Sequence, residues 1–164
     1  MRSILSFLIS FLIVAPSWGQ MYDPVKWSFN VDVINENEVD LVIHADIEEG
    51  WYVYSQDAGD GPISTSFAFS NNDKVELIGS VTEGEALEDY DPNFEATLRF
   101  FKSEADFKQR IKLLTQDTSL IKGEFEFMVC NKGMCLPPEW VDLELVLPAA
   151  KVAAEESKGF ASTY

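Results

Sequence analysis

The stretch Phe125-Glu-Phe-Met-Val-Cys-Asn-Lys-Gly-Met-Cys-Leu-Pro-Pro-Glu-Trp140 contains the only two cysteines of the chain, Cys130 and Cys135, with four residues between them. Its first half alternates apolar and polar side chains, and this period of two predicts a half-buried β-strand. Pro137 and Pro138 then exclude a helix and keep the backbone extended. The stretch therefore predicts β-structure on both sides of a cysteine-bearing turn.

A second alternating segment, residues 141–147, predicts the partner strand of a hairpin. Cys130 and Cys135 are then expected at opposite sides of the hairpin tip, near one edge, where their Cα atoms can come within the roughly 4.4–6.8 Å of a disulfide. Cys130 leaves its strand on the polar side, so we expect it to face solvent or a partner, with Lys132 at the tip. Five apolar side chains of the hairpin are expected to be buried between two sheets: Phe125, Phe127, Val129, Leu143 and Leu145.

The rest of the chain repeats this pattern of short apolar alternations separated by turn residues. It predicts about nine short strands and no helix, which is typical of an all-β, antiparallel β-sandwich. An acidic segment, residues 83–95, is expected to be irregular. Besides the hairpin, the expected strands are residues 27–33, 39–48, 51–54, 64–70, 75–81, 96–101 and 107–114.

The chain contains no set of nucleophile, base and acid, no glycine-rich phosphate loop and no internal repeat. Its only histidine, His44, falls on the polar face of the strand at residues 39–48, whose inward positions are apolar. A histidine is functional only through its neighbours, so we interpret His44 as a surface residue.

Residues 1–19 are predicted to be a cleaved signal peptide. Arg2 begins an apolar run at residues 4–15, and small residues at Ser17 and Gly19 precede a cut before Gln20. A retained membrane anchor is the alternative, but the run is shorter than the about 20 residues that span a bilayer. We therefore expect an exported domain at residues 20–148, without membrane insertion, in a compartment where a disulfide can persist.

The C-terminal residues 149–164 lack strand alternation and are rich in Ala, Lys, Glu and Ser. We interpret them as a flexible tail or linker. The formal net charge of −16 argues against nucleic acid and anionic membrane surfaces as partners, and favours solubility.

A cysteine pair in an exported sandwich is most often a structural disulfide, but three features of this pair favour exchange chemistry. The loop that it closes is short, so it stabilises the fold less than a long-loop disulfide does. A disulfide across a tight hairpin can be strained, which raises its reduction potential and makes it exchangeable. The pair also lies at an exposed tip, where Lys132 is the nearby cation that would favour a thiolate. The spacing differs from that of the thioredoxin pair, which has two intervening residues.

The segment Cys130-Asn-Lys-Gly-Met-Cys-Leu-Pro-Pro138 resembles the active-site hairpin in the N-terminal periplasmic domain of the protein-disulfide reductase DsbD. Two other segments agree with this resemblance. Gly50-Trp-Tyr-Val-Tyr54 is similar to the strand whose tyrosines flank the cysteines, and Asp91-Pro-Asn-Phe94 is similar to the cap loop that closes over them. The resemblance covers about residues 22–148. The sequence departs from the family in two respects. The loop between the cysteines has four residues here and five in enterobacterial members, and no transmembrane helices follow the domain in this sequence.

The resemblance implies an immunoglobulin-like domain in the periplasm that acts as a component of a protein-disulfide reductase, including in cytochrome c biogenesis. It implies a membrane-embedded thiol reductase as electron donor and oxidised periplasmic thioredoxin-like proteins as acceptors. Cys135 would attack the disulfide of the partner and Cys130 would resolve the mixed disulfide. The implied surroundings of the pair are a cap and flanking side chains: Phe94, Asp91, Tyr52 and Tyr54. Lys132 is added to them because it is close to the pair in the sequence. The chemistry needs no cofactor and no metal.

Two other functions remain open on the residues alone. The first is a passive binding module with a structural disulfide, in which aromatic side chains such as Trp51 and Tyr54 dock a partner or a glycan. The second is capture of Cu(I), for which thiolate and thioether sulfurs are suitable ligands. The four sulfur side chains of the hairpin lie close together in the sequence: Met128, Cys130, Met134 and Cys135.

Overall fold

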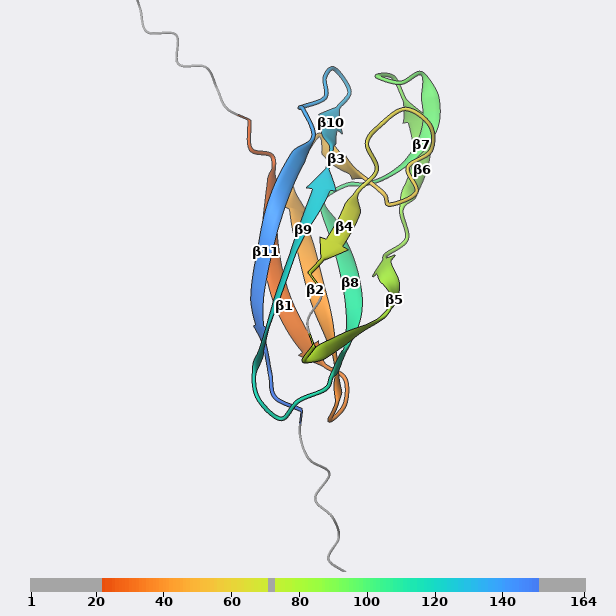
Figure 1. Cartoon of the computed structure of the whole chain (residues 1–164). Helices are drawn as coiled ribbons and strands as arrows, with labels where there is room; N and C mark the ends of the chain where they lie inside the picture. Colours follow the sequence, from red (N-terminus) through yellow and green to blue (C-terminus); the bar gives the residue numbers. More distant parts are fainter. Residues whose placement is uncertain (1–21, 71–72, 151–164) are drawn as a thin grey trace, which may run out of the picture.

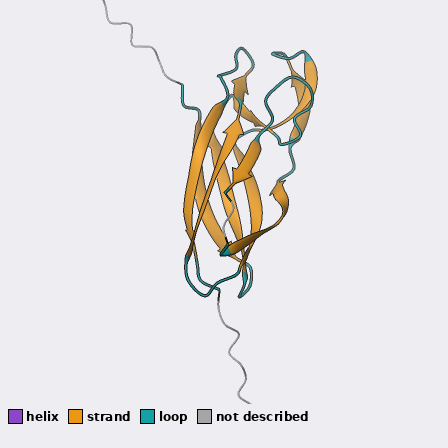
Figure 2. Cartoon of the chain, viewed as in Figure 1, coloured by secondary structure: helices purple, strands orange, loops and turns teal. Residues whose placement is uncertain are grey.

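The computed structural model describes residues 22–70 and 73–150, which form a β-sandwich (Figure 1). Every regular element in this part of the chain is a strand (Figure 2), and it contains no helix that would cross a membrane. The strands in chain order are β1 (Val25–Val33), β2 (Glu38–Ile47), β3 (Trp51–Tyr54), β4 (Ser66–Phe69), β5 (Val75–Glu83), β6 (Leu87–Asp91), β7 (Ala96–Phe101), β8 (Glu104–Leu113), β9 (Ser119–Phe127), β10 (Val129–Asn131) and β11 (Glu139–Leu147).

Two antiparallel sheets face each other and enclose the main core. Their strand orders are β1-β2-β8-β5 and β11-β9-β4. Aromatic rings connect the two layers, because Trp27 lies 4.5 Å from Phe125 and Phe67 lies 5.1 Å from Phe107 between ring centroids. The alternating apolar residues of both sheets therefore meet in one core, which confirms the predicted all-β, immunoglobulin-like sandwich.

A third, smaller sheet with the order β10-β3-β7-β6 lies at one end of the sandwich (Figure 1). Its strands turn one face to the main core, which receives Trp51, Val53 and Val129. Their sequence neighbours point to the other side, because successive side chains of a strand alternate between faces. There the side chains of this face and Ala58, from the loop after β3, form a separate apolar group, which we call the cysteine cluster: Tyr52, Tyr54, Ala58, Leu98, Phe100 and Cys130.

The predicted pairing of the cysteine-bearing segment with residues 141–147 is confirmed. Strand β9 pairs with β11 in an antiparallel register that sets Phe125 opposite Val141. Four of the five side chains expected in the core are buried, and Leu145 is half-buried against the same core. Cys130 follows β9 on β10, which is an edge strand as expected, and Cys135 lies between β10 and β11.

The prediction that Cys130 faces solvent is wrong, since its exposed fraction is 0%. The chain leaves the sheet of β9 after Phe127, and β10 pairs with β3 so that Cys130 lies opposite Tyr52. Cys130 does point away from the phenylalanines of β9, but the cysteine cluster covers it on that side. The alternation gave the correct face and could not indicate a second apolar layer.

The prediction that residues 83–95 are irregular is also wrong. Five of them form β6, which pairs with β7 from Leu87 opposite Phe100 to Asp91 opposite Ala96. Strand β6 is an edge strand with four exposed residues, so it shows no apolar alternation and is held by backbone pairing. In addition, β8 begins at Glu104, three residues before the expected start.

His44 lies on the surface of β2, where its Nδ1 is 2.7 Å from Oδ1 of Asp106 on β8. The two residues are opposite each other in the antiparallel register, so this contact is a cross-strand pair of a solvent-exposed sheet face. The predicted signal peptide at residues 1–19 and most of the predicted tail at residues 149–164 lie outside the described residues.

Candidate redox site

Cys130 and Cys135 form a disulfide with an S–S distance of 2.02 Å and Cα atoms 4.0 Å apart. The two residues also face each other as an isolated antiparallel bridge. Their environments differ, because Cys130 is fully buried whereas Cys135 is half-buried at the rim of the cysteine cluster. In this disulfide-bonded state, only Cys135 of the two residues is accessible to an approaching molecule.

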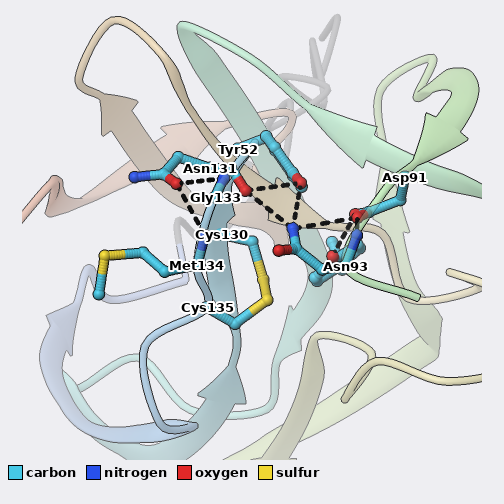
Figure 3. Close-up of a disulfide and its surroundings, with 9 residues drawn as sticks. Tyr52, Asp91, Asn93, Cys130, Asn131, Gly133, Met134 and Cys135 are labelled. Atoms are coloured by element: carbon cyan, nitrogen blue, oxygen red, sulfur yellow. Dashed lines mark hydrogen bonds between the residues drawn. A yellow bond between two sulfur atoms is a disulfide. The ribbon is translucent and has the colours of Figure 1, made fainter. Parts of the chain in front are cut away.

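The turn between the cysteines is held by Asn131. Its side-chain Oδ1 accepts hydrogen bonds from the backbone N–H groups of Gly133, at 2.8 Å, and Met134, at 3.0 Å (Figure 3). Its own N–H donates to the carbonyl of Met134 at 2.9 Å. Such local bonds are the reason why Asn is common in turns. They close the four-residue loop and bring the two cysteines face to face.

Tyr52 and Tyr54 of β3 both lie in the cysteine cluster, as the resemblance implied for residues that flank the pair. Tyr52 is opposite Cys130 in the register, and its ring centroid is 4.6 Å from that of Phe100. The two tyrosine rings meet edge to face at 5.7 Å. Alternation along β3 accounts for their common direction, because they are two residues apart.

Asp91 ends β6 inside the protein, with an exposed fraction of 1%. Its Oδ2 accepts a hydrogen bond of 2.5 Å from the Tyr54 hydroxyl, and its Oδ1 accepts one of 2.8 Å from the N–H of Asn93. Burial, followed by the nearby Asp91 carboxylate, raises the pKa of Tyr52 to about 12 and raises the pKa of Tyr54 still further. Both tyrosines therefore keep their hydroxyl protons at neutral pH and can act as donors.

Phe94 follows Asp91 in the turn between β6 and β7 and packs against the cysteine cluster. Its ring meets that of Tyr54 edge to face at 5.9 Å. On its other side lies the loop after β3, where a Cβ added to Gly61 would be 2.8 Å from Cδ1 of Phe94. Phe94 is half-buried in this position, and it packs against the cysteine cluster instead of the main core.

Lys132 is exposed at the hairpin tip, where the sequence predicts it. Among the described residues it forms no ion pair, and it lines a groove of about 630 Å³ beside the hairpin. The groove also contains the acidic side chains of Glu48, Glu49 and Asp89. Lys132 thus borders the site in a groove of mixed charge, which Lys102 also lines.

Asn93 is the residue of the site that the sequence did not indicate. Its side-chain Nδ2 lies 2.8 Å from the carbonyl oxygen of Asn131, 3.0 Å from the hydroxyl of Tyr52 and 3.1 Å from Oδ1 of Asp91 (Figure 3). It therefore connects the turn after β6 with the cysteine hairpin. The only sequence signal was its place in the segment similar to the cap loop, since an amide that binds a distant backbone carbonyl leaves no periodic pattern.

Comparisons with solved structures give matches of low sequence identity. The reduced N-terminal domain of DsbD from Neisseria meningitidis is 17% identical, with 76% of this chain and 86% of that chain covered and a TM-score of 0.48. The N-terminal periplasmic domain of ScsB from Proteus mirabilis is 16% identical and has a TM-score of 0.56. That match covers 81% of this chain and 52% of the ScsB chain, and it supports the fold.

A further match is the complex between the DsbD and PilB N-terminal domains of N. meningitidis, with 14% identity, 72% of this chain and 80% of that chain covered, and a TM-score of 0.48. A comparison with curated proteins gives no match. The family model of the N-terminal region of the thiol:disulfide interchange protein DsbD, in contrast, matches residues 20–147, nearly the whole described domain. The chain therefore belongs to the family of DsbD N-terminal domains.

Proposed function

We propose that this protein is a thiol:disulfide exchange domain that passes two electrons to oxidised partner proteins through Cys130 and Cys135. The observation that carries the proposal is the environment of the disulfide, which lies at an edge strand between a buried and a half-buried cysteine. A structural disulfide needs no accessible residue, whereas exchange requires that a partner sulfur reach one of the two. Membership of the DsbD family supports the same chemistry.

The exchange proceeds in two steps from the reduced form. The Cys135 thiolate attacks one sulfur of the partner disulfide, forms a mixed disulfide and releases the other partner sulfur as a thiolate. The Cys130 thiolate then attacks Sγ of Cys135, which restores the Cys130–Cys135 bond and releases the second partner thiolate. The partner gains two electrons, the cysteine pair loses two, and the released thiolates take protons from water.

The assignment of Cys135 as the attacking residue rests on access. A sulfur that attacks a disulfide must approach it in line, and the fully buried Cys130 has no open side for a protein partner. Cys135 is half-buried. Once Cys135 is joined to the partner, Cys130 is already opposite it on the hairpin and needs only a short movement to resolve the bond.

We further propose a periplasmic location, with residues 1–19 as the signal peptide, residues 20–148 as the domain and residues 149–164 as a linker or tail. The ScsB relative is a periplasmic domain, which supports this location. The DsbD N-terminal domain of N. meningitidis forms a complex with a PilB domain, and this supports thiol oxidoreductases as partners. We propose a membrane-embedded thiol reductase as the donor and oxidised periplasmic thioredoxin-like proteins as acceptors.

The reduction potential of the Cys130–Cys135 disulfide tests this function. We expect a value between about −270 and −120 mV, the range covered by thioredoxin, protein disulfide isomerase and similar exchange proteins. The measurement is equilibration with glutathione or dithiothreitol buffers followed by thiol alkylation and mass spectrometry. A value below about −300 mV would identify a structural disulfide and contradict the proposal.

A second prediction concerns Phe94 as a cover of the reduced pair. Phe94→Ala should leave the domain folded and make the dithiol react with oxidised glutathione about two- to tenfold faster, since a sulfur–aromatic contact is worth about 0.3–1.5 kcal/mol. The rate follows from alkylation of the remaining thiols over time. Phe69→Ala is the matched control, because Phe69 is also half-buried but packs on the main core. Equal oxidation rates of the Phe94 variant and the wild type would remove Phe94 from the cover.

A further inference from the structure

We propose that Asn93 is a positioning residue of the exchange reaction, which holds the cap loop closed by tying it to the cysteine hairpin. The cap loop is here residues 91–95, and the cysteine hairpin is residues 129–136. This inference rests on the proposed function, because the protection of a dithiol matters only if the pair is reduced during the reaction. The physical connection itself is a property of the folded protein and is testable in either redox state.

The connection is made by one side-chain amide group. Nδ2 of Asn93 donates to the carbonyl of Asn131 at 2.8 Å, and it lies 3.0 Å from the hydroxyl of Tyr52 and 3.1 Å from Oδ1 of Asp91 (Figure 3). These three acceptors belong to the cysteine hairpin, to β3 and to the cap loop itself. An amide has two hydrogens, so they are shared among the three acceptors, with the shortest contact directed to the hairpin.

The carbonyl of Asn131 depends on side chains for its hydrogen bonds. Its register partner on β3 is Trp51, whose N–H donates to the carbonyl of Glu48 instead. The Asn131 oxygen accepts from Tyr52 at 3.2 Å and from Asn93 at 2.8 Å. If a half-buried carbonyl loses its donor, the protein is destabilised by about the free energy of one hydrogen bond. The shorter of its two contacts comes from the cap loop, so opening of the cap leaves the hairpin carbonyl with one donor.

This carbonyl belongs to the residue that directly follows Cys130. The bond from Asn93 therefore fixes the backbone of the hairpin relative to the loop that carries Phe94. Asp91, at the start of the cap loop, is anchored by Tyr54. With Asp91 bound to this tyrosine and Asn93, in the middle of the loop, bound to the hairpin, the loop can lift only if the Asn93 contact breaks. A docking partner that offers its own donor to Asn131 would replace this contact.

The role requires a donor at position 93, and this makes the substitution Asn93→Asp informative. The new carboxylate would have the shape of the amide but no hydrogen to donate, and it would lie beside the Asp91 carboxylate, the Tyr52 hydroxyl and the Asn131 carbonyl. Two carboxylates and a carbonyl in contact repel one another, so the ionised form opens the loop. Protonation of the new group restores one donor and lets the loop close again.

Two variants, Asn93→Ala and Asn93→Asp, test the proposal. In both, we expect the reduced pair to react with oxidised glutathione at neutral pH about two- to tenfold faster than in the wild type, the effect of one lost hydrogen bond. Asn93→Ala combined with Phe94→Ala should add little to the single variants, since both act through the same loop. Asn30→Ala is the matched control, because its exposed amide also donates to a carboxylate, that of Asp32, on β1.

Amide hydrogen exchange of residues 91–95 in the oxidised protein provides a readout that a merely structural role would not move. In Asn93→Asp alone, protection should be present at low pH and be lost as the pH rises through the carboxyl pKa, about 3.9 or somewhat higher. Wild type and Asn93→Ala should lack this step. If the Asn93 variants are folded and show the oxidation rates and amide hydrogen exchange of the wild type, the proposal is overturned. This outcome is separable from failure of the proposed function, which the reduction potential of the wild type decides.

Discussion

Replacement of Cys135 by serine is expected to reduce disulfide transfer to the background level, whereas Cys130→Ser should still attack a partner and then stall. Only the half-buried Cys135 is accessible, so its loss removes the first step of the exchange. Without Cys130 the first step remains, but no thiol resolves the mixed disulfide. The Cys130→Ser protein should therefore accumulate a covalent adduct with an oxidised thioredoxin-like protein.

The measurement is the amount of mixed disulfide on non-reducing gels, with its linkage identified by mass spectrometry. The variant that lacks both cysteines is the control for non-specific adducts. The reverse pattern, in which only Cys135→Ser traps the partner, would assign the attack to the buried cysteine. It would require that Cys130, which has an exposed fraction of 0% here, becomes exposed before the reaction.

The second large effect is expected in the main core. Phe107 of β8 is fully buried, and its ring lies 5.1 Å from Phe67 and 5.6 Å from Phe101. Phe107→Ala removes these contacts and leaves a cavity between the two facing sheets, which should lower the free energy of unfolding by about 3–5 kcal/mol. The total free energy of unfolding of a domain of this size is only about 5–15 kcal/mol, so this loss is a large fraction of its stability.

Urea denaturation of the oxidised protein measures this loss. Trp140→Ala is the control, because Trp140 is an even larger aromatic residue with an exposed fraction of 61% on β11, and its removal should cost less than about 1 kcal/mol. A loss below about 1 kcal/mol for Phe107→Ala would mean that the two sheets do not pack on each other as described.

The core of the sandwich could be predicted because the sequence signal for it, the alternation of apolar and polar residues, lies within each strand. Alternation in β9 and β11 gives both the strand type and the face that is buried, and the pairing of these strands follows from the turn between them. Strand β6 could not be found in this way. Its side chains are mostly exposed, and its existence depends on the backbone of β7, which follows it in the chain.

The surroundings of the cysteine pair were predicted from the resemblance, and the structure gathers Tyr52, Tyr54, Asp91 and Phe94 near it. The residues themselves did not indicate this, because two segments that are distant from the hairpin in the sequence supply them. The burial of Cys130 was missed for the same reason. A polar-side position on one strand is buried only when another sheet covers it, and that depends on the pairing of β10 with β3.

The small sheet that carries the cysteines has one face in the main core and the other in the cysteine cluster. Neighbouring residues such as Val129 and Cys130, or Val53 and Tyr54, therefore belong to different packing environments. One face of each of these short strands therefore stabilises the sandwich, while the other surrounds the disulfide. A single inserted or deleted residue in a strand of only three or four residues would exchange the two faces and turn the cysteine side toward the main core.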